Sequence, residues 1–229
     1  MDEAMNPGPH SCPYGPPPPD DLVAWEAAWQ NHPTIGLGQP WRPAPETDFL
    51  AGQVTLGWSD QAWHVLAVLP DRDIHNSARG TQEPCWQTGD VFEIFFRPEG
   101  QESYFEIHLT PENHGCRLRF PGTAFRDQLL ASKPERTDWF LDYAFSPEGL
   151  VTHTRVQREK NRWLAGATLP FAAFLENGDI RPVRPWKTAF CRYDYTRGRD
   201  LPILSSTAGL PRPAFHASEH WPIMDFTAA

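Results

Sequence analysis

The strongest constraint on the fold is a pair of alternating segments in the middle of the chain. Residues 91–96 read Val-Phe-Glu-Ile-Phe-Phe, residues 103–110 read Ser-Tyr-Phe-Glu-Ile-His-Leu-Thr, and a turn at 98–101 separates them. Successive side chains of a strand point to opposite faces, so each segment has one largely apolar and one polar face. Together they predict an antiparallel β-hairpin whose apolar face is buried.

The polar face of this hairpin carries its most distinctive side chains. Glu93 lies on the first segment, Glu106 and His108 lie on the second, and Trp86 stands on the loop that enters the hairpin. Because the strands are adjacent, we expect the two carboxylates and the imidazole to be neighbours on an outward-facing surface. Two acids on neighbouring strands also have about the separation of the carboxyl pair in glycoside hydrolases.

Short alternating segments recur along most of the chain, with turn residues between them. Further strands are predicted at 53–59, 62–69, 115–120, 139–145, 150–157, 163–169, 187–195 and 222–226. A short helix is predicted after Asp20 or Asp21, where Leu22, Trp25 and Trp29 follow helical spacing. Many short strands, 25 prolines and little helix predict an all-β fold, an antiparallel β-sandwich with short helical turns.

The chain is predicted to form one domain. Residues 1–19 are rich in proline and glycine and read as a flexible N-terminal segment, and residues 20–229 supply the sandwich. A chain of 229 residues that is 40% hydrophobic can bury a full core. Residues 1–21 lack the pattern of a signal peptide, so the default expectation is a cytoplasmic protein, or a secreted or periplasmic one if an export signal was removed.

The charge pattern narrows the range of partners. The formal net charge is -9, and the sequence holds no cluster of lysine and arginine. This argues against nucleic acid and against an anionic membrane as partners. No apolar run reaches the length of a membrane span. A neutral or cationic ligand fits better, and the oligomeric state is left open.

The metal-binding residue types form no compact motif. Cys12, Cys85, Cys116 and Cys191 are too scattered for a CxxC pair, so free thiols are favoured over a disulfide, which is left open. Asp71, Asp73 and Asp90 offer oxygen ligands for a structural Ca²⁺, but they do not form a dense acidic loop. We therefore predict that no cofactor is required, with a structural Ca²⁺ at these three acids as the alternative to ordinary turn residues.

An ordered set of motifs resembles the family 9 carbohydrate-binding modules and their single-domain relatives, which have a DOMON-like, jelly-roll or immunoglobulin-like β-sandwich. The resemblance covers roughly residues 40–226. Its motifs are Pro40-Trp41, Asp48-Phe49, Ala62-Trp63-His64-Val65, Asp71-Arg72-Asp73-Ile74, Trp86, Gly89-Asp90-Val91-Phe92-Glu93-Ile94-Phe95, Tyr104-Phe105-Glu106-Ile107, Trp163 to Phe171, and Phe215-His216-Ala217 to Trp221.

The resemblance implies a site that binds a sugar. Members of the family hold a sugar between two aromatic side chains, at the positions of Trp86 and Phe215 here, and Glu93 matches the carboxylate on the strand. Many members are appendages of xylanases and other glycoside hydrolases, and members usually bind calcium. Glu106 and His108 stand where the best-known modules have an arginine and an amide, so reducing-end specificity is not carried over. Flat aromatic rings suit the apolar faces of a pyranose, and carboxylates suit its hydroxyls.

The function predicted from the sequence is a non-catalytic module that binds a mono- or oligosaccharide through Trp86, Glu93, Glu106, His108 and Phe215. Two alternatives stay open. One is a carbohydrate-active hydrolase that uses Glu93 and Glu106 as acid and base. The other is a partner-binding module without a ligand, in which the aromatic pair would pack inside and no groove would open beside Glu93. As an alternative to its role in a site, Glu93 is an ordinary strand residue with Arg192 as its structural partner.

Overall fold

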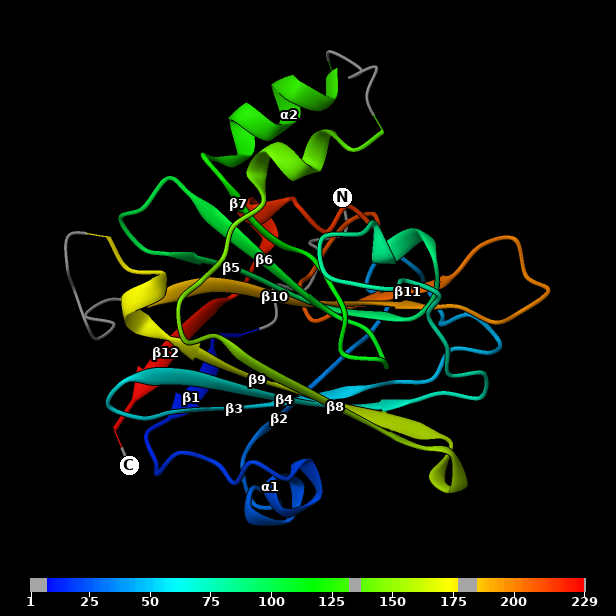
Figure 1. Ribbon diagram of the computed structural model, residues 1–229, viewed down its shortest axis with the longest axis horizontal. Coiled ribbons are helices and arrows are strands. Elements are labelled where there is room, and N and C mark those ends of the chain that lie inside the picture. The colour runs from blue at the N-terminus through cyan, green and yellow to red at the C-terminus, as the bar shows by residue number, and fades with distance from the viewer. Residues whose placement is uncertain (1–7, 132–136, 177–184, 229) are drawn as a thin grey trace.

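Two β-sheets pack face to face in the computed structural model, which describes residues 8–131, 137–176 and 185–228 (Figure 1). Within these residues, one sheet has seven strands in the order β1-β12-β10-β5-β6-β7, with β11 also paired to β10, and the other has five in the order β2-β3-β4-β9-β8. The strands of the larger sheet are β1 (His10–Pro13), β5 (Val91–Pro98), β6 (Tyr104–Leu109), β7 (Arg117–Phe120), β10 (Trp186–Asp194), β11 (Ile203–Ser206) and β12 (Ile223–Thr227). The smaller sheet contains β2 (Thr34–Gly36), β3 (Gln53–Trp58), β4 (Ala62–Pro70), β8 (Val151–Gln157) and β9 (Arg162–Pro170).

Two α-helices lie on the outer faces of the sandwich, and short 3₁₀ turns lie between its strands along the chain. The α-helices are α1 (Leu22–Ala28) and α2 (Thr123–Ala131). The 3₁₀ turns are η1 (Cys85–Gln87), η2 (Trp139–Tyr143), η3 (Arg158–Lys160), η4 (Phe171–Ala173) and η5 (Ser218–His220). In Figure 1, α1 lies below the five-stranded sheet and α2 lies above the seven-stranded sheet. No helix in the described part of the chain is long and apolar enough to cross a membrane.

The central hairpin is confirmed as β5 and β6. Their antiparallel register places Glu93 opposite His108 and Phe95 opposite Glu106. The alternate residues, which include Phe92, Ile94 and Phe96, pack into the core between the sheets. The period of two residues therefore predicted both the pairing and the buried face.

The opposite face of this hairpin is not the open surface that the sequence predicted. Glu93, Glu106 and His108 are each only 3% exposed. Residues on this face form a second apolar cluster with side chains of η2 and of the segment 208–221, which include Phe140, Phe215 and Trp221. The polar face is therefore covered by chain segments that are distant in sequence, and it forms a buried layer of its own.

Two local predictions near this cover differ from the structure. The segment 139–145 was predicted as a strand, but Trp139–Tyr143 is the 3₁₀ turn η2, which packs on β7. No element was predicted between residues 121 and 137, but Thr123–Ala131 forms α2. The tight turn of η2 carries the buried ring of Phe140 down onto the sheet, and this contact replaces the strand pairing that alternation alone suggested.

The predicted helix at residues 22–29 is confirmed as α1. The carboxylate of Asp21 accepts hydrogen bonds from the backbone N–H groups of Val23 and Ala24, which caps the helix. Leu22 and Trp25 pack directly over Gly166 of β9, where an added Cβ would lie 2.4 Å from Leu22 Cδ2. Glycine is required here because the helix approaches the sheet backbone so closely.

Part of the N-terminal segment that was predicted to be flexible is paired in the larger sheet. Residues His10–Pro13 form β1, which runs parallel to β12 and buries His10 and Cys12. All four cysteines are buried free thiols, as the sequence analysis favoured.

Two buried histidines each contribute stability that is lost in mild acid. Burial lowers the pKa of both His10 and His64 to about 4, against an ordinary value of 6.5. Their folded-state pKa lies below the unfolded one, so their contribution is complete above pH 6.5 and is lost as the pH falls toward 4. We expect each imidazole's own contribution to the free energy of unfolding to fall by up to ~3 kcal/mol over this range, which urea denaturation of the wild type and a variant without that imidazole measures.

A single variant separates this effect from general acid denaturation. Neither ring nitrogen of His10 has a hydrogen-bond partner among the described residues, so His10→Leu leaves no polar group unsatisfied. The difference in the free energy of unfolding between the wild type and His10→Leu should change by up to ~3 kcal/mol between pH 6.5 and 4, while His153→Gln, at a half-buried site, serves as the control. An unchanged pH profile in His10→Leu would contradict the assignment.

Candidate functional site

A pocket of about 280 Å³ opens on the outer face of the seven-stranded sheet. Its floor comes from β5, β6 and β10, and its walls come from η1, η2, β7 and the loop 213–216. The lining residues are Trp86, Glu93, Glu106, His108, Leu118, Phe120, Trp139, Phe140, Tyr193, Pro213, Ala214, Phe215 and His216. All five residues that were predicted to bind a sugar line this one pocket.

The floor of the pocket holds an imidazole close to two carboxylates. His108 Nε2 lies 3.5 Å from Glu93 Oε1 and 3.4 Å from Glu106 Oε2. The other oxygen of Glu106, Oε1, lies 2.9 Å from His216 Nδ1. Neither His108 Nε2 nor Glu106 Oε1 has a well-aligned hydrogen-bond partner among the described residues. Buried polar atoms of this kind retain hydrogen-bonding capacity for a ligand.

The environment separates the acidities of the two carboxyl groups. Burial raises the pKa of Glu93 to about 8, although the adjacent His108 acts to lower it. Burial also acts to raise the pKa of Glu106, but His216 and His108 outweigh it and hold that pKa at about 2. Burial acts to lower the pKa of His108, but Glu93, Cys85 and Glu106 raise it well above its ordinary value. At neutral pH the floor therefore carries a carboxylate at Glu106, an imidazolium at His108 and a largely protonated Glu93.

Aromatic side chains form the walls of the pocket. The half-buried Trp86 meets His108 edge-on at a ring-centroid distance of 5.5 Å and meets Phe140 at 5.0 Å. Phe215 is 3% exposed and contacts Tyr193 at 5.4 Å. Trp86 thus retains partial exposure in the pocket, whereas Phe215 is mostly packed into the body. The open pocket beside Glu93 is the feature that the ligand-free alternative predicted to be missing.

Several pocket residues were missed by the sequence analysis. The Nδ1 atom of His216 lies 2.9 Å from Glu106 Oε1 on the pocket floor and 3.1 Å from the hydroxyl oxygen of Tyr104. Trp139 and Phe140 come from the turn η2, which was predicted as a strand. The motif containing Phe215 and His216 was a signal that pointed to this loop, but no pattern linked η2 to the hairpin.

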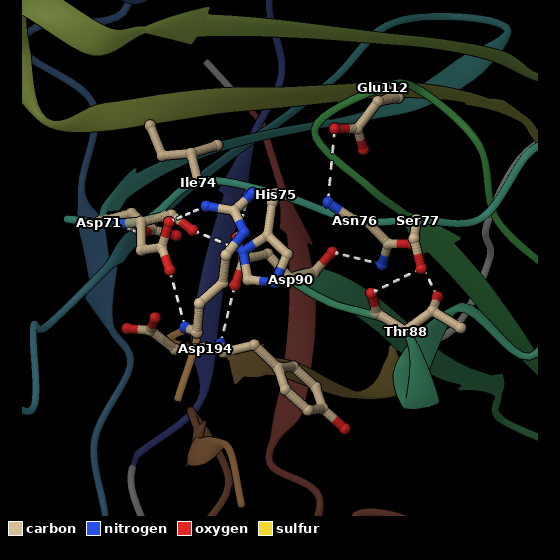
Figure 2. Close-up of polar contacts among 12 residues, drawn as sticks. Asp71, Ile74, His75, Asn76, Ser77, Thr88, Asp90, Glu112 and Asp194 are labelled. Carbon is tan, nitrogen blue, oxygen red and sulfur yellow. Dashed lines mark hydrogen bonds and ion pairs between the residues drawn. The ribbon is translucent and has the colours of Figure 1, made fainter. Parts of the chain in front are cut away.

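The three predicted calcium ligands do not act as one group. Asp71 and Asp90 lie with Asp194 so that one carboxylate oxygen of each falls within 4.8 Å of the others, and Figure 2 shows this cluster. Asp73 lies outside it and pairs with Arg197. Asp90 accepts hydrogen bonds from the backbone N–H groups of His75 and Tyr195.

The acidic cluster already contains a cation of the protein. Arg192 is 1% exposed, and its Nη2 lies 2.9 Å from Asp71 Oδ2 and 3.2 Å from Asp194 Oδ2. It is therefore not a partner of Glu93, which was the structural alternative for that carboxylate, because it points to the other face of β10. The residues present fit an ion-pair network better than a calcium site. The structural Ca²⁺ at Asp71, Asp73 and Asp90, which was the alternative to ordinary turn residues, stays untested.

Solved structures match this chain over nearly its whole length. A family 9 carbohydrate-binding module from Caldicellulosiruptor kristjanssonii in complex with cellotriose has a TM-score of 0.63 at 12% identity, covering 96% of this chain and 94% of its own. Such a module from the same organism in complex with glucose has a TM-score of 0.59 at 13% identity, covering 96% and 95%. The fold is that of the family 9 carbohydrate-binding modules.

A third similar structure agrees with this assignment of the fold. A Bacteroides uniformis protein named as carbohydrate-binding has a TM-score of 0.65 at 15% identity, covering 96% of this chain and 99% of its own. Neither a protein-family model nor a curated protein sequence matches the chain. The predicted β-sandwich and its likeness to the family 9 fold are therefore confirmed, and at these identities the likeness concerns the fold alone.

Proposed function

We propose that this protein binds a mono- or short oligosaccharide in the pocket over β5 and β6. The observation that carries the proposal is the pocket itself, in which buried polar atoms without aligned partners form the floor and aromatic rings form the walls. A sugar presents the matching chemistry, with apolar ring faces and a rim of hydroxyl groups. The solved modules in complex with cellotriose and glucose add support through the shared fold.

Each group in the pocket has a distinct part in the proposed complex. The carboxylate of Glu106 accepts hydrogen bonds from sugar hydroxyls, and the protonated Glu93 both donates and accepts them. His108 donates through Nε2 and balances the charge of Glu106. Trp86 packs on a face of the sugar ring, and Phe215 and Phe140 complete the apolar wall.

The size of the pocket limits the length of the bound sugar. A volume of about 280 Å³ lies at the lower end of the range for small-molecule sites, which is roughly 300–1,000 Å³. We therefore expect one or two sugar rings inside the pocket, and any further units of a longer chain outside it. Glucose, cellobiose and xylobiose are suitable first probes, the last because the family that the sequence resembles includes appendages of xylanases.

The test is a titration of the protein with these sugars, followed by intrinsic tryptophan fluorescence and isothermal calorimetry. We expect saturable binding that weakens by about 10- to 100-fold in Trp86→Ala, because the ring loses ~1.5–3 kcal/mol of apolar burial on the sugar. The exposed Tyr14, which contacts Trp58 away from the pocket, provides the control variant Tyr14→Ala. Equal affinity in Trp86→Ala and wild type would show that the sugar does not bind in this pocket.

The same samples separate binding from catalysis. Incubation with chromogenic glycosides should give no turnover, because the proposal assigns Glu93 and Glu106 to hydrogen bonding alone. Release of the chromophore that disappears in Glu93→Gln would instead favour a hydrolase with these acids as its catalytic pair.

A further inference from the structure

Two cysteines and a histidine meet directly beneath the pocket. The Sγ atoms of Cys85 and Cys116 and a ring nitrogen of His108 all lie within 4.8 Å of one another. Cys85 Sγ lies 3.7 Å from His108 Nδ1, so this contact uses the ring nitrogen that faces away from Glu93 and Glu106. The proposed sugar complex makes no use of either thiol.

The chain holds these three side chains together without a covalent link. Gln82 joins the two segments, since its side chain donates to the Arg117 carbonyl at 3.2 Å and accepts from the Arg117 N–H at 3.1 Å. The His108 N–H donates to the Cys116 carbonyl at 2.9 Å. At Gly115 the φ angle is +156°, and an added Cβ would lie 2.0 Å from the His108 carbonyl oxygen. Only glycine allows the loop to bring Cys116 so close to the strand.

We propose that Cys85, Cys116 and His108 form a binding site for a thiophilic d¹⁰ cation, Zn²⁺ or Cu⁺. Two thiolates and one imidazole are the ligands that such ions favour. With metal–ligand lengths of ~2.3 Å to sulfur and ~2.0–2.1 Å to nitrogen, tetrahedral or trigonal angles place sulfur and nitrogen about 3.6–3.8 Å apart. The separation of 3.7 Å between Cys85 Sγ and His108 Nδ1 matches this spacing.

The surroundings of the three ligands supply the outer contacts of a metal site. The Nε2 atom of His108 lies 3.5 Å from Glu93 and 3.4 Å from Glu106, so two carboxyl groups flank the ring on the side away from the thiols, where metal-bound histidines commonly have a carboxylate neighbour. The Cys116 thiol donates to the Glu83 carbonyl oxygen, which lies 2.8 Å from Sγ.

A metal at this site would be linked to the pocket floor through the imidazole ring of His108. A cation on Nδ1 leaves the proton on Nε2, where His108 faces the carboxylates and the pocket. The two buried thiols outside this group have different surroundings. Cys12 belongs to the core between the sheets, and Cys191 Sγ lies 3.4 Å from Ser206 Oγ. They provide matched controls for any thiol chemistry.

The test is metal binding by the full-length protein after treatment with a chelator and a reductant. Titration with Zn²⁺ against a chromophoric chelator, and with Cu⁺ under anaerobic reducing conditions, should give one ion per chain. Co²⁺ as a spectroscopic substitute should produce thiolate-to-metal charge-transfer absorption. Cys85→Ser and Cys116→Ser should each weaken binding by at least about 100-fold, while Cys12→Ser should leave the affinity unchanged.

The outcomes distinguish this site from its alternatives. Near-ultraviolet circular dichroism shows whether each serine variant keeps its tertiary packing, and the Co²⁺ spectrum of the wild type needs no variant at all. Absence of stoichiometric binding by both ions, or binding that survives in the Cys85→Ser/Cys116→Ser double variant, would overturn the proposal. So would a deficit of two free thiols in denatured, unreduced protein that is restored in Cys116→Ser, because that result assigns the pair to a disulfide. Sugar binding is measured separately, so either proposal can fail alone.

Discussion

Replacing Arg192 with methionine should lower the free energy of unfolding by about 3–5 kcal/mol, because it removes one partner of a buried ion-pair network. The guanidinium contacts Asp71 and Asp194 and donates to the Pro70 carbonyl at 2.7 Å. Without it, Asp71 and Asp194 lose the only buried cation that pairs with them among the described residues. For a chain of this size the loss corresponds to a fall in Tm of roughly 6–20 °C.

Two comparisons isolate the buried network in this measurement. Arg155→Met breaks an ion pair with Asp21 whose side chains are 55% and 54% exposed, so we expect less than ~1 kcal/mol. The double variant Arg192→Met/Asp71→Asn should recover part of the loss, since it also removes a carboxylate left unpaired. A loss in Arg192→Met as small as that in Arg155→Met would contradict the role assigned to the network.

Thermal unfolding of the wild type also tests the calcium prediction. Because Arg192 already neutralises Asp71 and Asp194, we expect neither Ca²⁺ nor a chelator to shift the Tm of the wild type. A saturable rise in Tm with Ca²⁺ would show instead that the ion binds the folded protein and would restore these acids as candidate ligands.

The hairpin could be predicted from the sequence because its signal is local. Alternation with a period of two fixes which side chains share a face, and this alone places Glu93, Glu106 and His108 together. The resemblance to the family 9 modules added Trp86 and Phe215, which line the same pocket. The part of the site built on one hairpin was thus accessible to pattern reasoning.

The rest of the site depends on contacts between segments that no local pattern connects. Whether the polar face meets solvent is decided by η2 and by the loop that carries His216, and both reach the sheet through tertiary packing. The meeting of Cys85 with Cys116 depends in the same way on the Gln82 bridge and on the close approach at Gly115.

The position of Arg192 shows that the register of a strand decides which face a side chain lies on. The β5–β10 pairing places Cys191, not Arg192, opposite Glu93. A step of one residue along a strand moves a side chain to the other face of the sheet. Arg192 therefore lies on the face toward the smaller sheet, where it meets Asp71, and the presence of an arginine on β10 could not by itself decide between the two faces.

Glu106→Ala should weaken sugar binding by about 30-fold to several-thousand-fold, the equivalent of ~2–5 kcal/mol, in protein freed of metal by a chelator. The variant removes the one group of the pocket floor that is a carboxylate at neutral pH, since His216 and His108 hold the pKa of Glu106 at about 2. Loss of Glu106 also removes a charge that raises the pKa of Glu93, so Glu93 can ionise and balance His108 at 3.5 Å, and we expect the fold to survive better than the affinity.

Substitution of the two floor acids by glutamine separates charge from shape. Glu106→Gln keeps the shape but removes the negative charge, so it should lose most of the affinity that Glu106→Ala loses. Glu93→Gln should cost much less, because burial keeps that carboxyl largely protonated and a carboxamide hydrogen-bonds in a similar way. Glu176→Ala, which breaks an exposed pair with Arg119, is the matched control. Calorimetry that ranks Glu93→Gln as the more damaging of the two glutamine variants would reverse the charge assignment of the floor, and Glu93 would then be the group that accepts the sugar hydroxyls as an anion.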